Sequence, residues 1–295
     1  MQIAMPPLTH PVRQLGSRRF DFDRQAAVMA IVNRTPDSFF DQGATFALES
    51  AVGAALAAAA GGADWVDVGG VKFAPGPEVE ASVELDRVLP VVEAVAAASD
   101  VVISVDTFRA EVAAACIAAG AHVVNDTTGL RDPEMASAVA ASGASLIITH
   151  SLAEPRQPYP SPRYDDIATE VRAALEERVQ RAVDAGIPEQ RLFIDPGHDL
   201  NKNTVQSLEL TRRMDEITRI GIPTLAAVSN KDFIGETLGV AKSERREGSI
   251  VAATVCVMLG ARVVRMHDVP AAVASMRMLE GILGFREPVQ AEHNV

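Results

Sequence analysis

The chain alternates eight times between a short run rich in valine and isoleucine and a longer amphipathic segment rich in alanine and leucine. We expect the short runs to be strands, at residues 28–32, 65–68, 101–105, 122–125, 146–149, 192–194, 224–228 and 263–266. We expect the longer segments to be helices, at residues 48–60, 79–98, 109–119, 133–142, 166–185, 205–220, 246–259 and 270–283. Strict alternation predicts parallel strands joined by helical crossovers, and eight units predict an α/β fold made of a single closed (β/α)₈ TIM barrel. An open sheet with fewer strands is the alternative.

Length and composition suit one large domain. The chain has 295 residues, 48% of them hydrophobic, and barrels of about 250 residues commonly form single domains. We expect an N-terminal lead-in over residues 1–25, the barrel over 26–286 and a C-terminal tail over 287–295. Two loops stand out, at 70–78 and 151–165, because both are rich in proline and follow expected strands. Long loops in a compact barrel are often lids or binding loops; a surface excursion is the other interpretation of 151–165.

Charge and cysteine content narrow the class of protein. A net charge of −12 argues against binding to nucleic acid or to an anionic membrane. No apolar run approaches the ~20 residues of a membrane span. Cys116 and Cys256 lie far apart in helical segments, which predicts buried free thiols and a cytoplasmic protein.

Polar side chains stand where the expected strands end. The residues at these ends are Asn33, Asp67, Asp106, Asn125, Asp126, His150, Asp195, Ser229, Lys231, Arg265 and His267. In a barrel, the carboxyl ends of all strands meet at one mouth. A single aspartate at such a position often only caps the next helix. Because so many polar groups converge, we expect several of them to line a binding cavity.

The chemistry of this set favours a flat heterocycle. Asp106 and Asp195 each offer two acceptor oxygens, which match a planar guanidine-like edge. Asn125 can donate and accept in the same plane, and Lys231 can donate to a ring carbonyl. A pterin has these features. A metal-hydrolase site is the competitor, but no HxH or HxxE spacing supports one. Arg265 and His267 follow the last strand, where barrels often bind phosphate.

Seven segments in order resemble the dihydropteroate synthase family over residues 28–285. They are IVNRTPDSF at 31–39, ADWVDVGG at 63–70, ISVDTFRAEVA at 103–113, VVNDTTGL at 123–130, FIDPG at 193–197, VSNKDFIG at 228–235 and RMHDV at 265–269. The family folds as a (β/α)₈ barrel and joins p-aminobenzoate to a hydroxymethyl-dihydropterin pyrophosphate.

The resemblance assigns roles to individual residues. It implies that the pterin is held by Asp106, Asn125, Asp195 and Lys231. It implies that pyrophosphate and its Mg²⁺ are held by Asn33, Arg265 and His267, with Asn33 on the metal. Loops at 34–43 and 70–78 would close over the substrates. The implied ligands are therefore a pterin and an arylamine, with Mg²⁺ as the cofactor.

The sequence departs from the family pattern on the pyrophosphate and arylamine side. The family reads GGESTRPG where this chain reads GGVKFAPG, so that Phe73 and Ala74 replace threonine and arginine. The family reads SRKSF where this chain has SNKDF, which places Asn230 and Asp232 at arginine and serine positions. DPGIGFGKT becomes DPGHDLNKN, and Leu200 replaces the aromatic residue expected beside the arylamine.

These losses have a predictable size. A hydrogen bond to a charged group contributes about 1.5–3 kcal/mol, so two missing arginines cost ~3–6 kcal/mol, roughly 10²–10⁴ in affinity or rate. A carboxylate at Asp232, if ~6 Å from a pyrophosphate charge, would add roughly 3 kcal/mol of repulsion. We therefore predict a paralogue with little or no ordinary synthase activity, which retains weak binding of pterins or of sulfone- or sulfonamide-like arylamines.

Several alternatives remain open at this stage. A working dihydropteroate synthase could use Lys72 and Arg34 in place of the missing arginines. A corrinoid-dependent transferase of the same superfamily and a non-catalytic scaffold are further classes. Late helices that are apolar on more than one face suggest a homodimer, although packing within the barrel wall explains them nearly as well.

Overall fold

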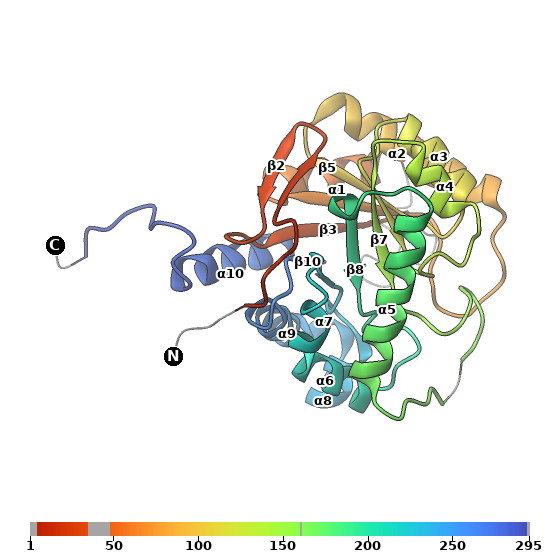
Figure 1. The fold of residues 1–295 in the computed structure, drawn as a ribbon. Helices are drawn as coiled ribbons and strands as arrows, with labels where there is room; N and C mark the ends of the chain where they lie inside the picture. The colour runs from red at the N-terminus through yellow and green to blue at the C-terminus, as the bar shows by residue number, and fades with distance from the viewer. Residues whose placement is uncertain (1–4, 35–47, 160, 294–295) are drawn as a thin grey trace.

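The computed structural model describes residues 5–34, 48–159 and 161–293, and its centre is an eight-stranded parallel barrel (Figure 1). The strands are β3 (Ala27–Asn33), β4 (Trp65–Gly69), β5 (Val102–Asp106), β6 (Val123–Asp126), β7 (Ser145–Thr149), β8 (Leu192–Asp195), β9 (Leu225–Ala226) and β10 (Val263–Met266). They are hydrogen-bonded in the order β8-β7-β6-β5-β4-β3-β10-β9. A parallel bridge between Ile194 and Thr224 joins β8 to the start of β9 and brings the two edges together. The (β/α)₈ prediction is confirmed.

Helices connect the strands around the outside of the barrel. They are α1 (Leu48–Ala60), α2 (Ala81–Ala98), α3 (Ala110–Ala118), α4 (Met135–Ala140), α5 (Ile167–Asp184), α6 (Thr204–Arg212), α7 (Met214–Thr218), α8 (Asp232–Leu238), α9 (Arg246–Met258) and α10 (Val269–Ile282). Short 3₁₀ turns, η1 (Glu189–Arg191) and η2 (Lys242–Glu244), precede β8 and α9.

Three expected elements differ from the structure. The single helix expected at 205–220 is divided into α6 and α7 at Arg213, whose backbone leaves the helical region (φ −107°, ψ 25°). Buried apolar residues keep their helical spacing across this break, at Leu210, Met214 and Ile217, which is why the sequence pattern predicts one helix. The strand expected at 224–228 is reduced to two residues, and the short helix α8 follows it. The expected first-loop segment 34–43 lies, apart from Arg34, outside the described residues.

The amino-terminal end of the barrel, where the strands begin, is filled by an N-terminal hairpin. Strands β1 (Val12–Leu15) and β2 (Arg18–Asp21) pair antiparallel and lie across the amino ends of the barrel strands (Figure 1). Phe20 and Phe22 pack with Trp65 and Phe193, with 5.2 Å between the Trp65 and Phe193 ring centroids. Because this end is packed with aromatic rings, space for a ligand is left at the opposite end.

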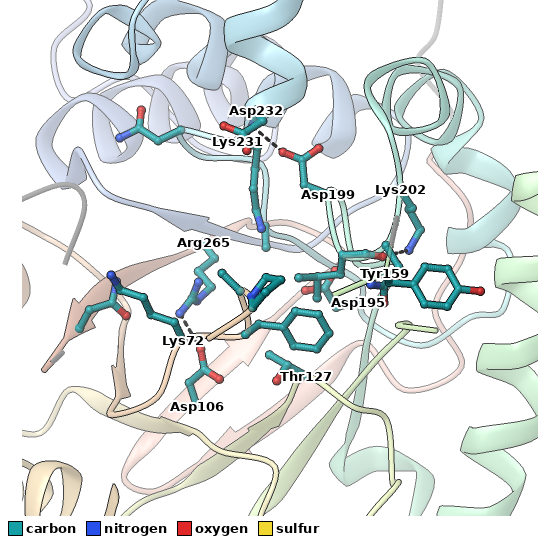
Figure 2. Close-up of a pocket in the computed structure, with 18 of the residues that line it drawn as sticks. Lys72, Asp106, Thr127, Tyr159, Asp195, Asp199, Lys202, Lys231, Asp232 and Arg265 are labelled. Carbon is teal, nitrogen blue, oxygen red and sulfur yellow. Dashed lines mark hydrogen bonds and ion pairs between the residues drawn. The ribbon is translucent and has the colours of Figure 1, made fainter. Parts of the chain in front are cut away.

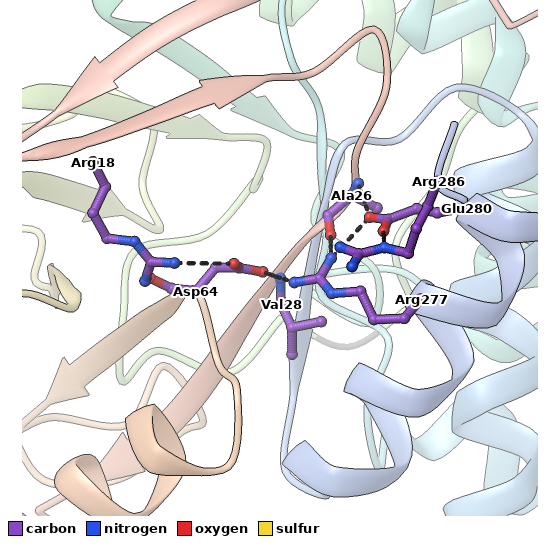
Figure 3. Close-up of polar contacts among 7 residues, drawn as sticks. All are labelled: Arg18, Ala26, Val28, Asp64, Arg277, Glu280 and Arg286. Carbon is purple, nitrogen blue, oxygen red and sulfur yellow. Dashed lines mark hydrogen bonds and ion pairs between the residues drawn. The ribbon is translucent and has the colours of Figure 1, made fainter. Parts of the chain in front are cut away.

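Two buried carboxylates fasten the last helix to the same amino-terminal end of the barrel (Figure 3). Asp64 accepts hydrogen bonds from the Val28 amide and from Arg277, both at 2.9 Å. Glu280 accepts from the Ala26 amide at 3.0 Å and from Arg277 at 2.8 Å. Every carboxylate in this group is paired, as burial of charge requires. The charges here are structural and lie away from the cavity at the carboxyl ends of the strands.

The boundary between the N-terminal lead-in and the barrel, drawn between residues 25 and 26, stays a prediction.

The two cysteines are buried and free, which confirms the prediction for Cys116 and Cys256. No helix in the described part of the chain is long and apolar enough to cross a membrane.

Candidate active site at the barrel mouth

A cavity of about 550 Å³ opens at the carboxyl ends of the strands (Figure 2). All seven residues expected to hold pterin or pyrophosphate line it: Asn33, Asp106, Asn125, Asp195, Lys231, Arg265 and His267. All five positions that depart from the family pattern line it too: Phe73, Ala74, Leu200, Asn230 and Asp232. The structure thus brings the two halves of the expected site into one space. The ligand assigned to each residue stays a prediction.

An arginine lies between two carboxylates in the floor of the cavity. Arg265 donates from Nε to Asp67 Oδ2 at 2.6 Å and from a terminal nitrogen to Asp106 Oδ2 at 2.9 Å. Asn125 Nδ2 also donates to Asp67 Oδ2, at 3.1 Å. Asn125 Oδ1 is buried and has no hydrogen-bond partner in the described part of the chain. The floor therefore contains a buried acceptor whose hydrogen-bonding capacity is unused, which marks it as a candidate binding group.

Burial changes the acidity of the two aspartates expected to hold the pterin. Desolvation raises the pKa of Asp106 to about 7, and the nearby Arg265 only partly opposes this rise. Desolvation also raises the pKa of Asp195 to about 6, although its Oδ1 accepts a hydrogen bond from the Gly197 amide at 2.7 Å. Both groups therefore gain or lose a proton near neutral pH, where perturbed pKa values mark candidate functional sites.

The loop after β8 is held on both sides by residues that the sequence analysis did not assign. Asp199 and Asn201 adopt left-handed backbone angles, with φ of 59° and 54°, which aspartate and asparagine tolerate better than most residues. Asp199 Oδ2 accepts from the amides of Asp232 at 2.5 Å and Phe233 at 3.3 Å, at the start of α8. Asn201 Oδ1 accepts from two amides of the loop after β7, at 2.9 and 2.8 Å. The loop is thus fastened to both of its neighbours.

Lys202, in the same loop, is a third residue that sequence reasoning missed. Its ammonium group contacts His150 Nδ1 at 3.0 Å, Gly197 O at 3.0 Å and Leu200 O at 3.1 Å. Burial lowers the pKa of Lys202 to about 7 and the pKa of His150 to about 2. His150, expected at a strand end, therefore supports this loop and does not line the cavity. The one sequence signal for Lys202 is its position in the loop that follows the FIDPG segment.

Asp126, another expected strand-end residue, is a turn residue. Its two carboxylate oxygens accept from the amides of Thr128 at 2.8 Å and Leu130 at 2.6 Å. It is buried and does not line the cavity.

Two expectations about charge at the rim need correction. Asp232 forms an ion pair with Arg245 at 2.8 Å, and 79% of its side chain is exposed. The repulsion predicted for a pyrophosphate is therefore smaller than roughly 3 kcal/mol, because a paired and solvated carboxylate is screened. Arg34 donates to the backbone oxygens of Asp86 and Arg87 on α2, at 2.9 and 2.7 Å, and does not line the cavity. Of the two cations proposed as substitutes, only Lys72 lies at the site.

The two proline-rich loops contact one another and form one wall of the cavity. The Arg156 amide donates to Phe73 O at 3.0 Å, and its guanidinium donates to Ala74 O at 2.5 Å and Pro77 O at 3.0 Å. Gln157 and Tyr159 line the cavity beside these contacts. The loop at 151–165 is therefore part of the cavity wall.

The fold is a TIM barrel with a polar cavity at the carboxyl ends of its strands, as in many barrel enzymes. Comparison with known sequences identifies the family. The family described as pterin binding enzyme matches residues 29–267, and the chain belongs to this family. Within it, the chain is 45% identical to the protein named "Inactive dihydropteroate synthase 2" of Mycobacterium leprae, over 91% of this chain and 94% of that one. It is 39% identical to the dihydropteroate synthase of Escherichia coli, over 88% of this chain and 93% of that one.

Solved structures of the family have the same fold. The dihydropteroate synthase of Yersinia pestis, in complex with a sulfonamide drug, matches with a TM-score of 0.88 and 35% identity over 92% of this chain and 99% of that one. The enzyme of Xanthomonas albilineans, in complex with 7,8-dihydropteroate, matches with a TM-score of 0.82 and 37% identity over 92% of this chain and 98% of that one.

Proposed function

We propose that this chain is a dihydropteroate synthase-like paralogue that binds pterins and has little or no ordinary synthase activity. The observation that carries this proposal is the shared cavity. The expected pterin set is retained on its floor, whereas the positions that depart from the family pattern line the same space. The two positions at which the family pattern has arginine, Ala74 and Asn230, therefore belong to the cavity lining. The name "Inactive dihydropteroate synthase 2", given to relatives in Mycobacterium leprae and Mycobacterium tuberculosis, supports the same conclusion.

Arg265, which is retained on the pyrophosphate side, is already paired. Its guanidinium is shared between Asp67 and Asp106, so it must give up one of them to turn fully toward a pyrophosphate. A hydrogen bond between charged groups contributes about 1.5–3 kcal/mol. If Arg265 gives up one carboxylate to bind an anion, this free energy is lost and reduces the net free energy of anion binding. Weak binding of a pterin or of a sulfone- or sulfonamide-like arylamine is compatible with these losses, because neither ligand requires the pyrophosphate contacts.

The cavity residues fit Mg²⁺ only as a partner of a phosphate ligand. Asn33 Oδ1 and Asp106 Oδ2 both face Gly69, where an added Cβ would meet them at 3.4 and 3.6 Å. One amide oxygen and one carboxylate already bound to Arg265 make an incomplete cage, and Mg²⁺ commonly completes its shell with water and substrate phosphate. The described residues include no group of three or more His, Cys, Asp or Glu side chains arranged for a metal. We place any Mg²⁺ beside Asn33, bound with pyrophosphate.

We further propose a cytoplasmic homodimer. Buried free cysteines suit a reducing compartment. Val251 on α9 and Met278 and Ile282 on α10 are 62–66% exposed, and such apolar surface on late helices suits a contact between two copies.

Two measurements test the proposed function. In the first, the rate of dihydropteroate formation from the pterin pyrophosphate and p-aminobenzoate is compared with that of the Escherichia coli relative. We expect a rate at least 10² lower, from the two lost arginine contacts. A comparable rate, or robust growth of a complemented synthase-deficient strain without folate end-products, would overturn the proposal and favour a working synthase that relies on Lys72.

In the second measurement, calorimetry follows the binding of a 6-hydroxymethyl-dihydropterin. We expect binding that Asp106→Asn weakens about tenfold or more, because the variant loses a charged acceptor. Asp100→Asn is the matched control, since Asp100 is exposed two residues before β5, at the other end of the barrel. No heat at millimolar ligand would favour a scaffold without pterin binding.

A further inference from the structure

Lys202 is a buried lysine whose ammonium group is fully used by the protein. Only 6% of the residue is exposed. Its ammonium contacts His150 Nδ1 at 3.0 Å, Gly197 O at 3.0 Å and Leu200 O at 3.1 Å, with His150 O further away at 3.4 Å. An ammonium has three N–H donors, so the three short contacts occupy all of them. Although Lys202 lines the cavity, it has no donor left for a ligand.

The charge of Lys202 is balanced from a distance by two carboxylates. Burial lowers the pKa of Lys202, and the negative charges of Asp195 and Asp199 oppose this change. Lys202 is in turn one of the cations that oppose the rise in the pKa of Asp195 caused by burial. Asp199 already accepts hydrogen bonds from the amides at the start of α8. Because a buried charge needs compensation, Lys202 and Asp195 stabilise each other across the turn that lies between them.

One residue, Gly197, connects Lys202 to Asp195. Its carbonyl accepts from Lys202 at 3.0 Å, and its amide donates to Asp195 Oδ1 at 2.7 Å. Gly197 has a φ of 71°, and an added Cβ would lie 2.1 Å from His150 O and 3.4 Å from Lys202 Nζ. Only glycine fits there, and glycine rotates more freely than any other residue. The direction of the Gly197 amide therefore depends on the groups that hold its carbonyl.

Lys202 completes a ring of contacts around the end of β8. The Leu200 amide also donates to Gly197 O, at 3.0 Å, which closes the turn internally. Lys202 ties this turn to His150, the residue after β7. The His150 amide donates to Asp195 O at 2.9 Å. The contacts thus run from Asp195 through Gly197, Lys202 and His150 back to Asp195. Asp195 and Lys202 both line the cavity (Figure 2).

We propose that Lys202 is a positioning residue for pterin binding: through Gly197 and His150 it holds the Asp195 carboxylate in the direction in which it meets the ring. The inference rests on the proposed function and adds a residue on which the floor of the cavity depends. Lys202 itself makes no ligand contact.

The first test needs no ligand. Carbon-13 NMR of the aspartate side chains follows the ionisation of Asp195 in the parent and in Lys202→Met. Burial raises the pKa of Asp195 to about 6, and the Gly197 amide and the charges of Lys231, Lys202 and Arg265 oppose the rise. We expect the midpoint in Lys202→Met to lie about one pH unit or more higher, because the variant loses both a nearby charge and the support of the Gly197 amide.

The second test is a double-mutant cycle for pterin binding. NMR of the ligand follows titration with 6-hydroxymethyl-dihydropterin and reaches millimolar dissociation constants. We expect Lys202→Met to weaken binding about tenfold, because a misdirected carboxylate loses a charged contact. In an Asp195→Ala background the same change should cost less than about twofold, since the side chain that Lys202 positions is gone. In an Asp106→Asn background the cost should stay about tenfold, because Asp106 lies outside the ring of contacts.

Two controls accompany the variants. Arg24→Met removes an exposed positive charge before β3, at the opposite end of the barrel, and should change neither the Asp195 midpoint nor pterin binding. Fluorescence of Trp65 checks folding, and Lys202→Gln is the second variant if Lys202→Met does not fold. If neither folds, nitrogen-15 NMR of the lysine ammonium groups decides in the parent. The Lys202 signal should then shift near pH 6, where Asp195 gains its proton.

The outcomes separate the two proposals. An unchanged Asp195 midpoint overturns the positioning role, as does unchanged pterin binding in Lys202→Met or a parent Lys202 signal without the shift. A tenfold loss that persists in the Asp195→Ala background also overturns it, because Lys202 would then only support the cavity wall. If the parent binds no pterin, the proposed function fails. The Asp195 midpoint alone then decides whether Lys202 positions this carboxylate: a raised midpoint supports that role and an unchanged one overturns it.

Discussion

Replacement of His198 by isoleucine should stabilise the protein, and should do so more at acid pH. His198 is fully buried beside Phe233, with 6.0 Å between ring centroids, and neither ring nitrogen has a hydrogen-bond partner within the described ranges. The dihydropteroate synthase pattern has isoleucine at this position. A buried polar group without a partner costs about 1–3 kcal/mol, so we expect His198→Ile to raise the free energy of unfolding by about this amount at pH 7.5.

The pH dependence follows from the pKa of His198. Burial, together with the positive charges of Lys202 and Lys231, lowers the pKa of His198 from an ordinary value of 6.5 to about 3. Below pH 6.5 the unfolded chain binds a proton that the folded protein does not bind until about pH 3, so stability falls as pH falls through this window. At pH 5, which lies 1.5 pH units below the unfolded-state pKa of 6.5, His198 lowers the free energy of unfolding by about 2 kcal/mol. The advantage of His198→Ile should therefore grow by about 2 kcal/mol between pH 7.5 and pH 5.

Denaturant unfolding followed by the fluorescence of Trp65, the single tryptophan, measures both quantities. The difference between variant and parent isolates this group from the buried aspartates, whose raised pKa values act in the opposite direction. His10→Gln is the control, because His10 is exposed. Parallel pH profiles of the variant and the parent, or a less stable variant at pH 7.5, would refute the reasoning.

Three further predictions concern the cavity and its rim. Pterin affinity should fall about tenfold or more between pH 8 and pH 6, because the ionised fraction of Asp106, with a pKa of about 7, falls from about 90% to about 10%. Calorimetry should show only a fall of about twofold in Asp106→Asn, which leaves Asp195 with its pKa of about 6. Asp199→Ala removes the acceptor at the start of α8 and should lower the free energy of unfolding by about 1 kcal/mol, whereas Asp199→Asn, which retains an acceptor, should cost less in the same denaturation assay. Gly76→Ala places a Cβ against the Arg156 guanidinium and should displace it from its carbonyl partners; limited trypsin digestion should then cleave after Arg156 faster than in the parent, and equal rates would mean that the contact does not hold the loop.

The sequence by itself determined the barrel and the location of the site. Eight alternations of strand and helix leave few alternatives, because parallel strands require crossovers and the carboxyl ends of those strands then meet at one mouth. Asn33, Asp106, Asn125, Asp195, Lys231, Arg265 and His267 could be placed at that mouth for this reason alone. The departures from the family pattern were equally visible, since they replace one residue type by another at fixed positions.

Only the tertiary structure decided which partner each side chain has. The sequence analysis assigned no role to Asp199, and folding turns it toward the amides at the start of α8. Lys202 carried no signal of burial, yet a cage of backbone oxygens surrounds it. The same is true of Arg34, which the fold directs to α2, and of Asp232, which it pairs with Arg245. Strand order is set by local patterns that the chain carries in its sequence, whereas the direction of a long side chain depends on atoms far away along the chain.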